Sequence, residues 1–244
     1  MLDPELQLIA GTAWLFSRGQ LNQHVHTLFV DEGGQVSLAD AIAVGTAGRN
    51  LVLLGDPNQL PQVSQGSHPP GAEASVLAHL LRDDETVRPD MGLFIEHTWR
   101  MRKEVCEFIS TSFYEGRLKP ADVCAERSVE LRNGVRFLPV EHSGHRQASP
   151  EEAAAVAAEI DRLLGTPYCD EHGERALESG DVVVVAPYNA HVRRLREQIP
   201  DPRIRIGTVD KFQGQQAAVV FYSMASSSGE DVPRGSSSCS RATV

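Results

Sequence analysis

Two neighbouring carboxylates stand directly after a short apolar run near the start of the chain. Residues 27–30 (TLFV) lead into Asp31 and Glu32. A continuous apolar run of this length is typical of a strand covered on both faces, as in a parallel sheet. At the carboxyl end of such a strand an acid can hold Mg²⁺, and its neighbour can polarise an attacking water. The pair therefore suggests hydrolysis at a phosphate, with a solvated strand end as the alternative.

A second apolar run, residues 51–54, ends in a turn with the sequence GDPNQLP. Gly55 permits a tight turn and Pro57 stiffens it, so that Asn58 or Gln59 can be held at a fixed place. A neutral amide beside a terminal phosphate can report whether that phosphate is present, because it forms hydrogen bonds without adding charge. An ordinary turn after a strand is the alternative.

These two turns must be positioned by elements that alternate along the chain. A third apolar run covers residues 182–185, and Ser149 is placed to cap a helix that begins at Pro150. Alternating strands and helices favour an α/β fold with parallel strands and right-handed crossovers. We expect residues 140–149 to form a loop in a second domain that begins near Asp90. The expected helices are residues 38–47, 76–81, 103–114, 150–164 and 190–198.

Composition limits the class of protein. Hydrophobic residues make up 41% and charged residues 23% of the 244 residues, which is typical of a globular protein. The formal charge of −10 argues against binding nucleic acid by bulk charge but leaves a local basic groove open. No apolar run is long enough to span a membrane and the start lacks a secretory signal, so we expect a cytoplasmic protein. The cysteines form no C-x-x-C pair, so neither a zinc site nor a disulfide framework is expected.

Five segments resemble, in order, motifs of superfamily 1 helicases over roughly residues 6–225. The resemblance is greatest to the branch whose members usually move 5′ to 3′ on DNA or RNA. It implies two RecA-like parallel-sheet domains, residues 1–90 and 91–225, the first incomplete. Residues 226–244 are rich in Ser and Gly, and we expect them to form a poorly ordered or frameshifted tail. The segments are FVDEGGQVSLADA, LVLLGDPNQLPQV, HTWRMRKEVCEFIS, VVVVAPYNAHVRRL and IGTVDKFQGQQAAVVFYSMA.

The resemblance assigns roles on the nucleotide side. Asp31 resembles the acid that coordinates Mg²⁺, and Glu32 resembles the residue that activates water. Gln59 resembles the glutamine that senses the γ-phosphate. Arg100 resembles the arginine that reaches the phosphates and stabilises developing charge, with a surface salt bridge as the alternative. The remaining residues expected to contact the nucleotide are Gly55, Asp56, Gly214 and Gln216.

The resemblance also assigns residues to a single strand of DNA or RNA. Pro187, Tyr188 and Asn189 resemble a strand-end contact, where an aromatic or amide group suits sequence-independent binding. Core packing is an equal alternative for Tyr188. Thr208 and Gln213 belong to a loop similar to motif V, which touches both the nucleic-acid backbone and the nucleotide. In that loop Gln216 stands where many relatives carry Glu, and a neutral amide can still accept the ribose hydrogen bond.

A phosphate-cradling loop, G-x-x-x-x-G-K-[ST], is missing from the sequence. None of the three lysines, Lys103, Lys119 and Lys211, follows a glycine. No motif VI with its arginine follows residue 225. We therefore expect a truncated piece of an ATP-dependent helicase that lacks turnover alone and needs the upstream half. Its first sheet would have unpaired edges and exposed apolar faces.

Two other classes of function stay open. A non-catalytic module that binds single-stranded nucleic acid, or another partner, would need no phosphate loop. A metal-dependent phosphoesterase or nuclease could use Asp31, Glu32 and Asp56. That enzyme would not account for Gln59, Arg100 or the motif V loop.

Overall fold

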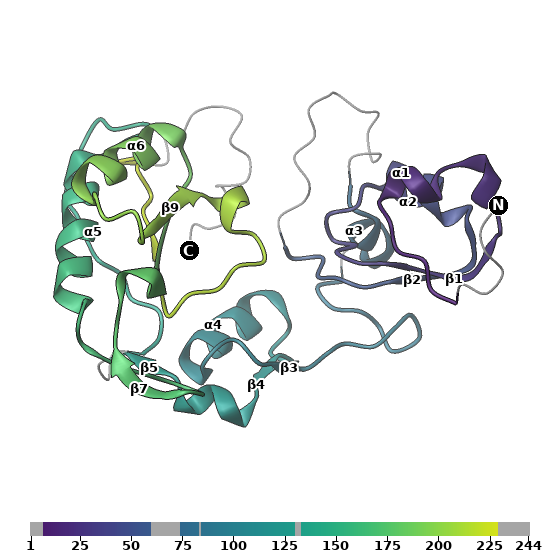
Figure 1. Ribbon diagram of the computed structural model, residues 1–244, viewed down its shortest axis with the longest axis horizontal. Coiled ribbons are helices and arrows are strands. Elements are labelled where there is room, and N and C mark those ends of the chain that lie inside the picture. The colour runs from purple at the N-terminus through teal and green to yellow at the C-terminus, as the bar shows by residue number, and fades with distance from the viewer. Residues whose placement is uncertain (1–6, 60–73, 83, 130–132, 229–244) are drawn as a thin grey trace. The chain divides into compact units, whose positions relative to one another are not determined.

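The protein is described by a computed structural model in which the chain splits into two compact units (Figure 1). The first unit contains the residues up to Phe94 and the short segment Phe113–Glu115. The second contains Ile95–Ser112 and the residues from Gly116 onward. The residues that the structure describes are 7–59, 74–82, 84–129 and 133–228.

The first unit is built around two parallel strands. Strand β1 pairs with β2 in parallel, with Val30 opposite Leu53. Helix α2 begins where expected, because the Ser37 hydroxyl accepts a hydrogen bond from the Asp40 N–H at 3.1 Å. A small core of Phe16, Leu21, Leu28, Val44 and Ala47 lies between these elements. The elements are α1 (Ala13–Phe16), η1 (Gly19–Leu21), β1 (Val25–Val30), α2 (Leu38–Gly45), β2 (Gly48–Leu53) and α3 (Val76–Leu81).

The prediction that the first two strands are covered on both faces is wrong for the described residues. Leu28 is buried, but the side chain of Phe29 is 62% exposed and that of Leu51 is 43% exposed. Only β1 and β2 pair in this sheet within the described ranges, so each strand has apolar side chains that no further layer covers. The exposed apolar face that we expected for an incomplete first sheet is present.

The second unit has a larger sheet. Strand β8 lies between β10 and β9, and both neighbours run parallel to it. All five residues of β8 are buried, as the apolar run predicts. Helices α5 and α6 pack against each other and enclose the core with this sheet (Figure 1). The elements of this sheet and its helices are α5 (Pro150–Leu163), β8 (Val182–Ala186), α6 (Asn189–Gln198), β9 (Arg205–Thr208), η4 (Val209–Phe212) and β10 (Val219–Tyr222).

Smaller elements complete the second unit. An antiparallel sheet of order β5-β6-β7, which we did not predict, follows a short parallel pair of β3 and β4. Helix α4 ends at Phe113, and residues 140–148 form the expected loop. Among the described residues, no helix is both long and apolar enough to cross a bilayer. The elements are β3 (His97–Thr98), α4 (Lys103–Phe113), β4 (Lys119–Pro120), η2 (Asp122–Glu126), β5 (Ser128–Val129), β6 (Pro167–Asp170), β7 (Gly173–Ala176) and η3 (Ser179–Asp181).

Candidate functional site

Two loops of the first unit meet at the carboxyl ends of β1 and β2. The Gly33 N–H donates to the carbonyl of Leu54 at 2.7 Å. A Cβ atom on Gly34 would stand 2.0 Å from the carbonyl oxygen of Asp56, and one on Gly55 would stand 2.7 Å from the nitrogen of Gly33. The acidic loop and the GDPNQ turn therefore pack backbone against backbone, and only glycine fits at these contacts. We had expected Gly55 to permit a tight turn but had not singled out Gly34.

The acidic pair has a strained backbone. Glu32 has a φ of 54°, which is uncommon for a residue with a side chain and is typical of functional turns. The Glu32 N–H donates to Asp31 Oδ1 at 2.9 Å, and Gln35 Nε2 donates to Glu32 Oε2 at 3.3 Å. Both acids are exposed, and neither forms an ion pair with a residue that the structure describes. Their remaining oxygens are available to a cation or to water.

The donor set of this loop fits Mg²⁺. Adjacent carboxylates supply the hard oxygen ligands that Mg²⁺ prefers. In the described part of the chain, no group of three or more His, Cys, Asp or Glu residues could hold a metal by itself. Mg²⁺ usually keeps several waters and shares its ligands with substrate phosphates, so one or two protein carboxylates suffice. Asp31 and Glu32 are therefore suited to a magnesium–phosphate complex rather than to a closed protein site.

The GDPNQ turn is fixed by its own side chains. Asp56 Oδ1 accepts from the Asn58 N–H at 2.9 Å, and Asp56 Oδ2 accepts from the Tyr114 hydroxyl at 2.5 Å. Asn58 Nδ2 donates to the carbonyl of Phe113 at 2.8 Å. Burial and the hydrogen bond to Asp56 raise the pKa of Tyr114. Both the Asp56 carboxylate and the Asn58 amide thus have protein partners, while Gln59 is exposed next to them.

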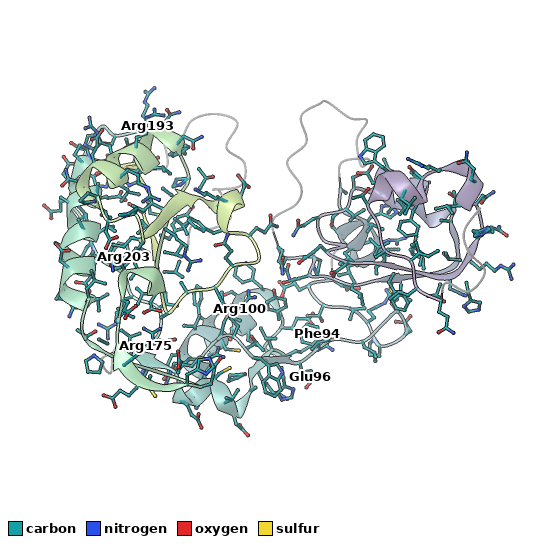
Figure 2. All side chains as sticks on the ribbon, viewed as in Figure 1. Phe94, Glu96, Arg100, Arg175, Arg193 and Arg203 are labelled. Carbon is teal, nitrogen blue, oxygen red and sulfur yellow. The ribbon has the colours of Figure 1, made fainter. Side chains whose placement is uncertain are left out.

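Arg100 lies in the second unit between β3 and α4 (Figure 2). Its N–H donates to Thr98 Oγ1 at 3.2 Å, and its carbonyl accepts from Arg127 Nη1 at 3.0 Å. The side chain is exposed, and no described carboxylate pairs with its guanidinium. The backbone is held by the fold, while the charged group is available to a ligand.

The predicted strand-binding residues share one edge of the larger sheet. Ala186 and Thr208 are paired in register, so Pro187 and the loop after Thr208 leave neighbouring strands at the same edge. Asn189 is exposed at the start of α6. Tyr188 is half-buried, and its hydroxyl is buried with no hydrogen-bond partner in the part of the chain that is described. An unpaired buried hydroxyl is unfavourable, which distinguishes Tyr188 from an ordinary packed side chain.

The motif V loop is tied to β9 by Arg205. Arg205 Nη1 donates to Gln215 Oε1 at 3.0 Å, and Nη2 donates to the carbonyl of Gln216 at 3.3 Å. Gly214 has a φ of 74°, which glycine adopts without strain. The side chains of Gln213 and Gln216 are exposed. The loop therefore has a fixed base and presents two amides.

A buried polar network that we did not predict lies behind the same sheet edge. Glu152 on α5 is 8% exposed, and its Oε1 accepts from His142 Nε2 at 2.8 Å. Its Oε2 accepts from the Ser223 hydroxyl at 2.5 Å, and both oxygens lie 3.1 Å from the N–H of Ala225. A buried carboxylate needs several donors, and these three supply them. Glu152 thus fastens the chain that leaves β10.

His191, for which we had predicted no role, completes this network. Ser223 donates its proton to Glu152, so it accepts from His191 Nε2, at 2.7 Å. The other ring nitrogen, Nδ1, then accepts from the Ser149 N–H at 3.3 Å. This arrangement fits a neutral imidazole, and burial lowers the pKa of His191 in agreement. The first turn of α6, which begins at Asn189, is thereby joined to α5 and to the end of β10.

Residues 73–237 match the family model described as the AAA domain, and the chain belongs to this family. With the motif order given above, this places it among the superfamily 1 helicases. The chain is 23% identical over 242 residues to the DNA replication ATP-dependent helicase/nuclease JHS1 of Arabidopsis thaliana, with 89% of this chain and 17% of the relative covered.

Two relatives from Schizosaccharomyces pombe are similar at a comparable level. The DNA polymerase alpha-associated DNA helicase A is 26% identical, with 86% of this chain and 34% of the relative covered. Helicase sen1 is 25% identical, with 82% of this chain and 13% of the relative covered. The chain thus spans about a third or less of the length of these curated relatives.

Proposed function

We propose that this chain is part of an ATP-driven motor that moves along, or unwinds, nucleic acid. The observation that carries the proposal is the close packing of the Asp31–Glu32 loop on the GDPNQ turn at the ends of two paired parallel strands. Open α/β sheets place their ligands at this edge. The relatives, named as helicases, support the same class.

In this proposal each of the exposed polar side chains of the candidate site has one role in nucleotide binding or hydrolysis. Asp31 holds the Mg²⁺ of magnesium–ATP, which neutralises phosphate charge when it is bound. Glu32 orients the attacking water, and Gln59 hydrogen bonds to the γ-phosphate. Arg100 stabilises the charge that develops on the phosphates during transfer. Because protein donors occupy the Asp56 carboxylate, we propose that Asp56 serves the nucleotide by shaping the turn together with Gly55.

The second unit supplies the proposed nucleic-acid contact. Pro187, Tyr188 and Asn189 contact a single strand from one sheet end, and Thr208 and Gln213 contact its backbone from the next. Gly214 and Gln216, in the same loop as Gln213, contribute to the nucleotide. With a net charge of −10, these contacts are local, and the affinity depends on a few groups rather than on bulk charge.

The proposed parent has two RecA-like domains, residues 1–90 and 91–225 of this chain, and a phosphate-binding loop from a further segment. No Gly-Lys pair occurs in the sequence, so binding without turnover is the second candidate function for the chain alone. We also propose a cytoplasmic location, which the free thiols of Cys106, Cys124 and Cys169 favour.

Two binding measurements on the purified chain test the proposal. Anisotropy of a labelled single-stranded oligonucleotide is followed across a salt series, and a fluorescent ATP analogue is titrated with Mg²⁺ while phosphate release is recorded. We expect salt-sensitive strand binding that Asn189→Ala and Thr208→Ala weaken, and no turnover by the chain alone. Turnover that Glu32→Gln abolishes, and that Glu174→Gln on exposed β7 retains, would assign hydrolysis to the chain itself. A chain that binds neither strand nor nucleotide would contradict the proposed function.

A further inference from the structure

The segment Phe113–Glu115 holds the GDPNQ turn through side-chain and backbone groups. The Tyr114 hydroxyl donates to Asp56 Oδ2 at 2.5 Å, and it is the only donor described for that oxygen. The carbonyl of Phe113 accepts from Asn58 Nδ2 at 2.8 Å. These two hydrogen bonds engage two side chains of the turn that precede Gln59 in the sequence.

The same segment is anchored on its other side. Glu115 Oε2 accepts from the hydroxyl of Thr86 at 2.5 Å, and Thr86 is 5% exposed. The ring of Tyr114 lies 6.1 Å, centroid to centroid, from the ring of Phe94, which Figure 2 labels. The phenol is thus held by ring packing and by its neighbour in sequence, so its hydroxyl has a fixed position relative to Asp56.

A phenol suits this contact chemically. A neutral hydroxyl that donates to a carboxylate forms a short, charge-assisted hydrogen bond. A phenol with an ordinary pKa of about 10 is already protonated at neutral pH, and burial and the hydrogen bond to Asp56 raise the pKa of Tyr114 further. With Oδ2 held by Tyr114, Oδ1 remains free to accept the Asn58 N–H and close the turn.

The segment Phe113–Glu115 is connected through helix α4 to the segment that carries Arg100. Helix α4 (Lys103–Phe113) begins three residues after Arg100 and ends directly before Tyr114. Its residues up to Ser112 belong to the second unit, whereas Phe113–Glu115 belong to the first. One continuous helix therefore links the arginine-bearing segment to the residues that hold the turn.

We propose that Tyr114 is a positioning residue for Gln59: its hydrogen bond to Asp56 fixes the phosphate-sensing turn and ties that turn to the helix that follows Arg100. The positioning of the turn does not require nucleotide, whereas the sensing of a γ-phosphate rests on the proposed function. The two parts can be tested separately on the same chain.

The first arm measures amide hydrogen exchange of Asn58 and Gln59 by NMR in the chain without nucleotide. Tyr114→Phe keeps the ring and removes one hydroxyl. We expect exchange at these two amides to accelerate by about tenfold or more, as loss of one hydrogen bond to a charged group implies. Tyr168→Phe is the matched control, because that phenol is partnered by Asp170 in the β6–β7 hairpin. Unchanged exchange at Asn58 and Gln59 in Tyr114→Phe would overturn the proposal.

Asp56→Asn alters the same hydrogen bond at its acceptor. It provides a second test in case the Tyr114→Phe variant does not fold. An amide offers one acceptor oxygen where the carboxylate serves two donors, the Tyr114 hydroxyl and the Asn58 N–H, so we expect an acceleration at least as large as in Tyr114→Phe. Tyr114→Phe added to Asp56→Asn should then have less effect than it has alone. Full additivity of the two substitutions would contradict a direct contact between them.

The second arm measures the ratio of the dissociation constants of fluorescent ADP and ATP analogues. A sensor of the γ-phosphate acts on ATP alone, so Tyr114→Phe should bring this ratio toward one and leave ADP affinity unchanged. An equal loss of affinity for both analogues would show a general structural role and would overturn the sensing part. If the unmodified chain binds neither analogue, the proposed nucleotide function fails, and the exchange arm alone decides the positioning of the turn.

Discussion

The two units fix their loops by different means. In the first unit the described core is five residues, and apolar side chains such as Phe29 and Leu51 remain exposed on the strands. The two turns of its candidate site are set by backbone contacts at Gly34 and Gly55. In the second unit a core cluster of thirteen buried residues surrounds β8, and Glu152 fixes the chain beyond the sheet by hydrogen bonds.

This difference indicates which substitutions should destabilise each unit. Because its core is small, the first unit depends on close packing of main chains, and a single methyl group added at such a contact is destabilising. The second unit has the larger apolar core, but its buried carboxylate depends on every hydrogen-bond donor around it. Substitutions can separate these two kinds of dependence.

The largest effect is expected at Glu152. Glu152→Ala leaves His142, Ser223 and the Ala225 N–H without an acceptor, and should lower the free energy of unfolding by about 3–5 kcal/mol. Urea denaturation followed by circular dichroism measures the change. Glu151→Ala, in the same first turn of α5 but exposed, is the control and should cost far less. Equal effects of the two substitutions would show that the network contributes little.

A smaller effect is expected at Gly34. In Gly34→Ala the new methyl group must displace the carbonyl of Asp56, which we expect to cost about 2–3 kcal/mol in the first unit. Gly45→Ala is the control, because its Cβ meets nothing within 4 Å at the end of helix α2 and should be neutral or slightly stabilising. Thermal unfolding of both variants gives the comparison. A Gly34→Ala chain as stable as the parent would show that the two loops do not pack as described.

The sequence predicts features that depend on neighbouring residues better than contacts between residues far apart in the chain. Helix ends came within one or two residues of their expected places, and Ser149 caps α5 as predicted, because caps and apolar periodicity are local signals. The antiparallel β5-β6-β7 sheet was missed, since its short strands carry no long apolar run. Tyr114 was predicted only as the end of a helix. Its hydrogen bond to Asp56 joins two residues 58 positions apart in the sequence, which no local pattern reveals.

The candidate site likewise contains contacts that the sequence predicts and contacts that it does not. The grouping of Asp31 with the GDPNQ turn was predictable because parallel strands align their carboxyl ends. The partners of Glu152 were not, because His142, His191 and Ser223 come from a loop, a helix and a strand end that no local pattern relates. Residues 60–73, which include the end of the GDPNQLP segment, lie outside the described residues.

A pH-dependent loss of stability should belong to the second unit. Burial lowers the folded-state pKa of His191 below its usual value, so the unfolded chain binds the proton more readily. The stability due to neutral His191 is present above about pH 6.5 and is lost as the pH falls through the folded-state pKa. The titratable groups that face His191 are Glu152 and His142.

Urea denaturation between pH 7.5 and 5 tests this dependence. His191→Gln removes the titrating ring and should flatten the profile, whereas exposed His172→Gln should leave it as in the parent. A profile that stays equally steep in His191→Gln would assign the acid sensitivity to other groups.

The smallest effect is expected on the exposed face of the first sheet. Phe29→Thr replaces a 62% exposed ring by a residue that also favours strands, and should change stability by less than about 0.5 kcal/mol. Leu28→Thr, at the buried neighbouring position, should be far more damaging. Light scattering should show fewer aggregates for Phe29→Thr, because an apolar patch is removed. A large loss of stability in Phe29→Thr would mean that this face is covered.

The hydrogen bonds around Glu152 also define a path for mechanical load. A pull on the chain at Ser228 would meet Ser227, which is bonded to His142 and His145, and then Ala225, which is bonded to Glu152, before it reached the end of β10. Tension would pass sideways into helix α5 instead of peeling β10 from β8. In the motor proposed above, such a side anchor would keep the central sheet intact while its loops carry the force.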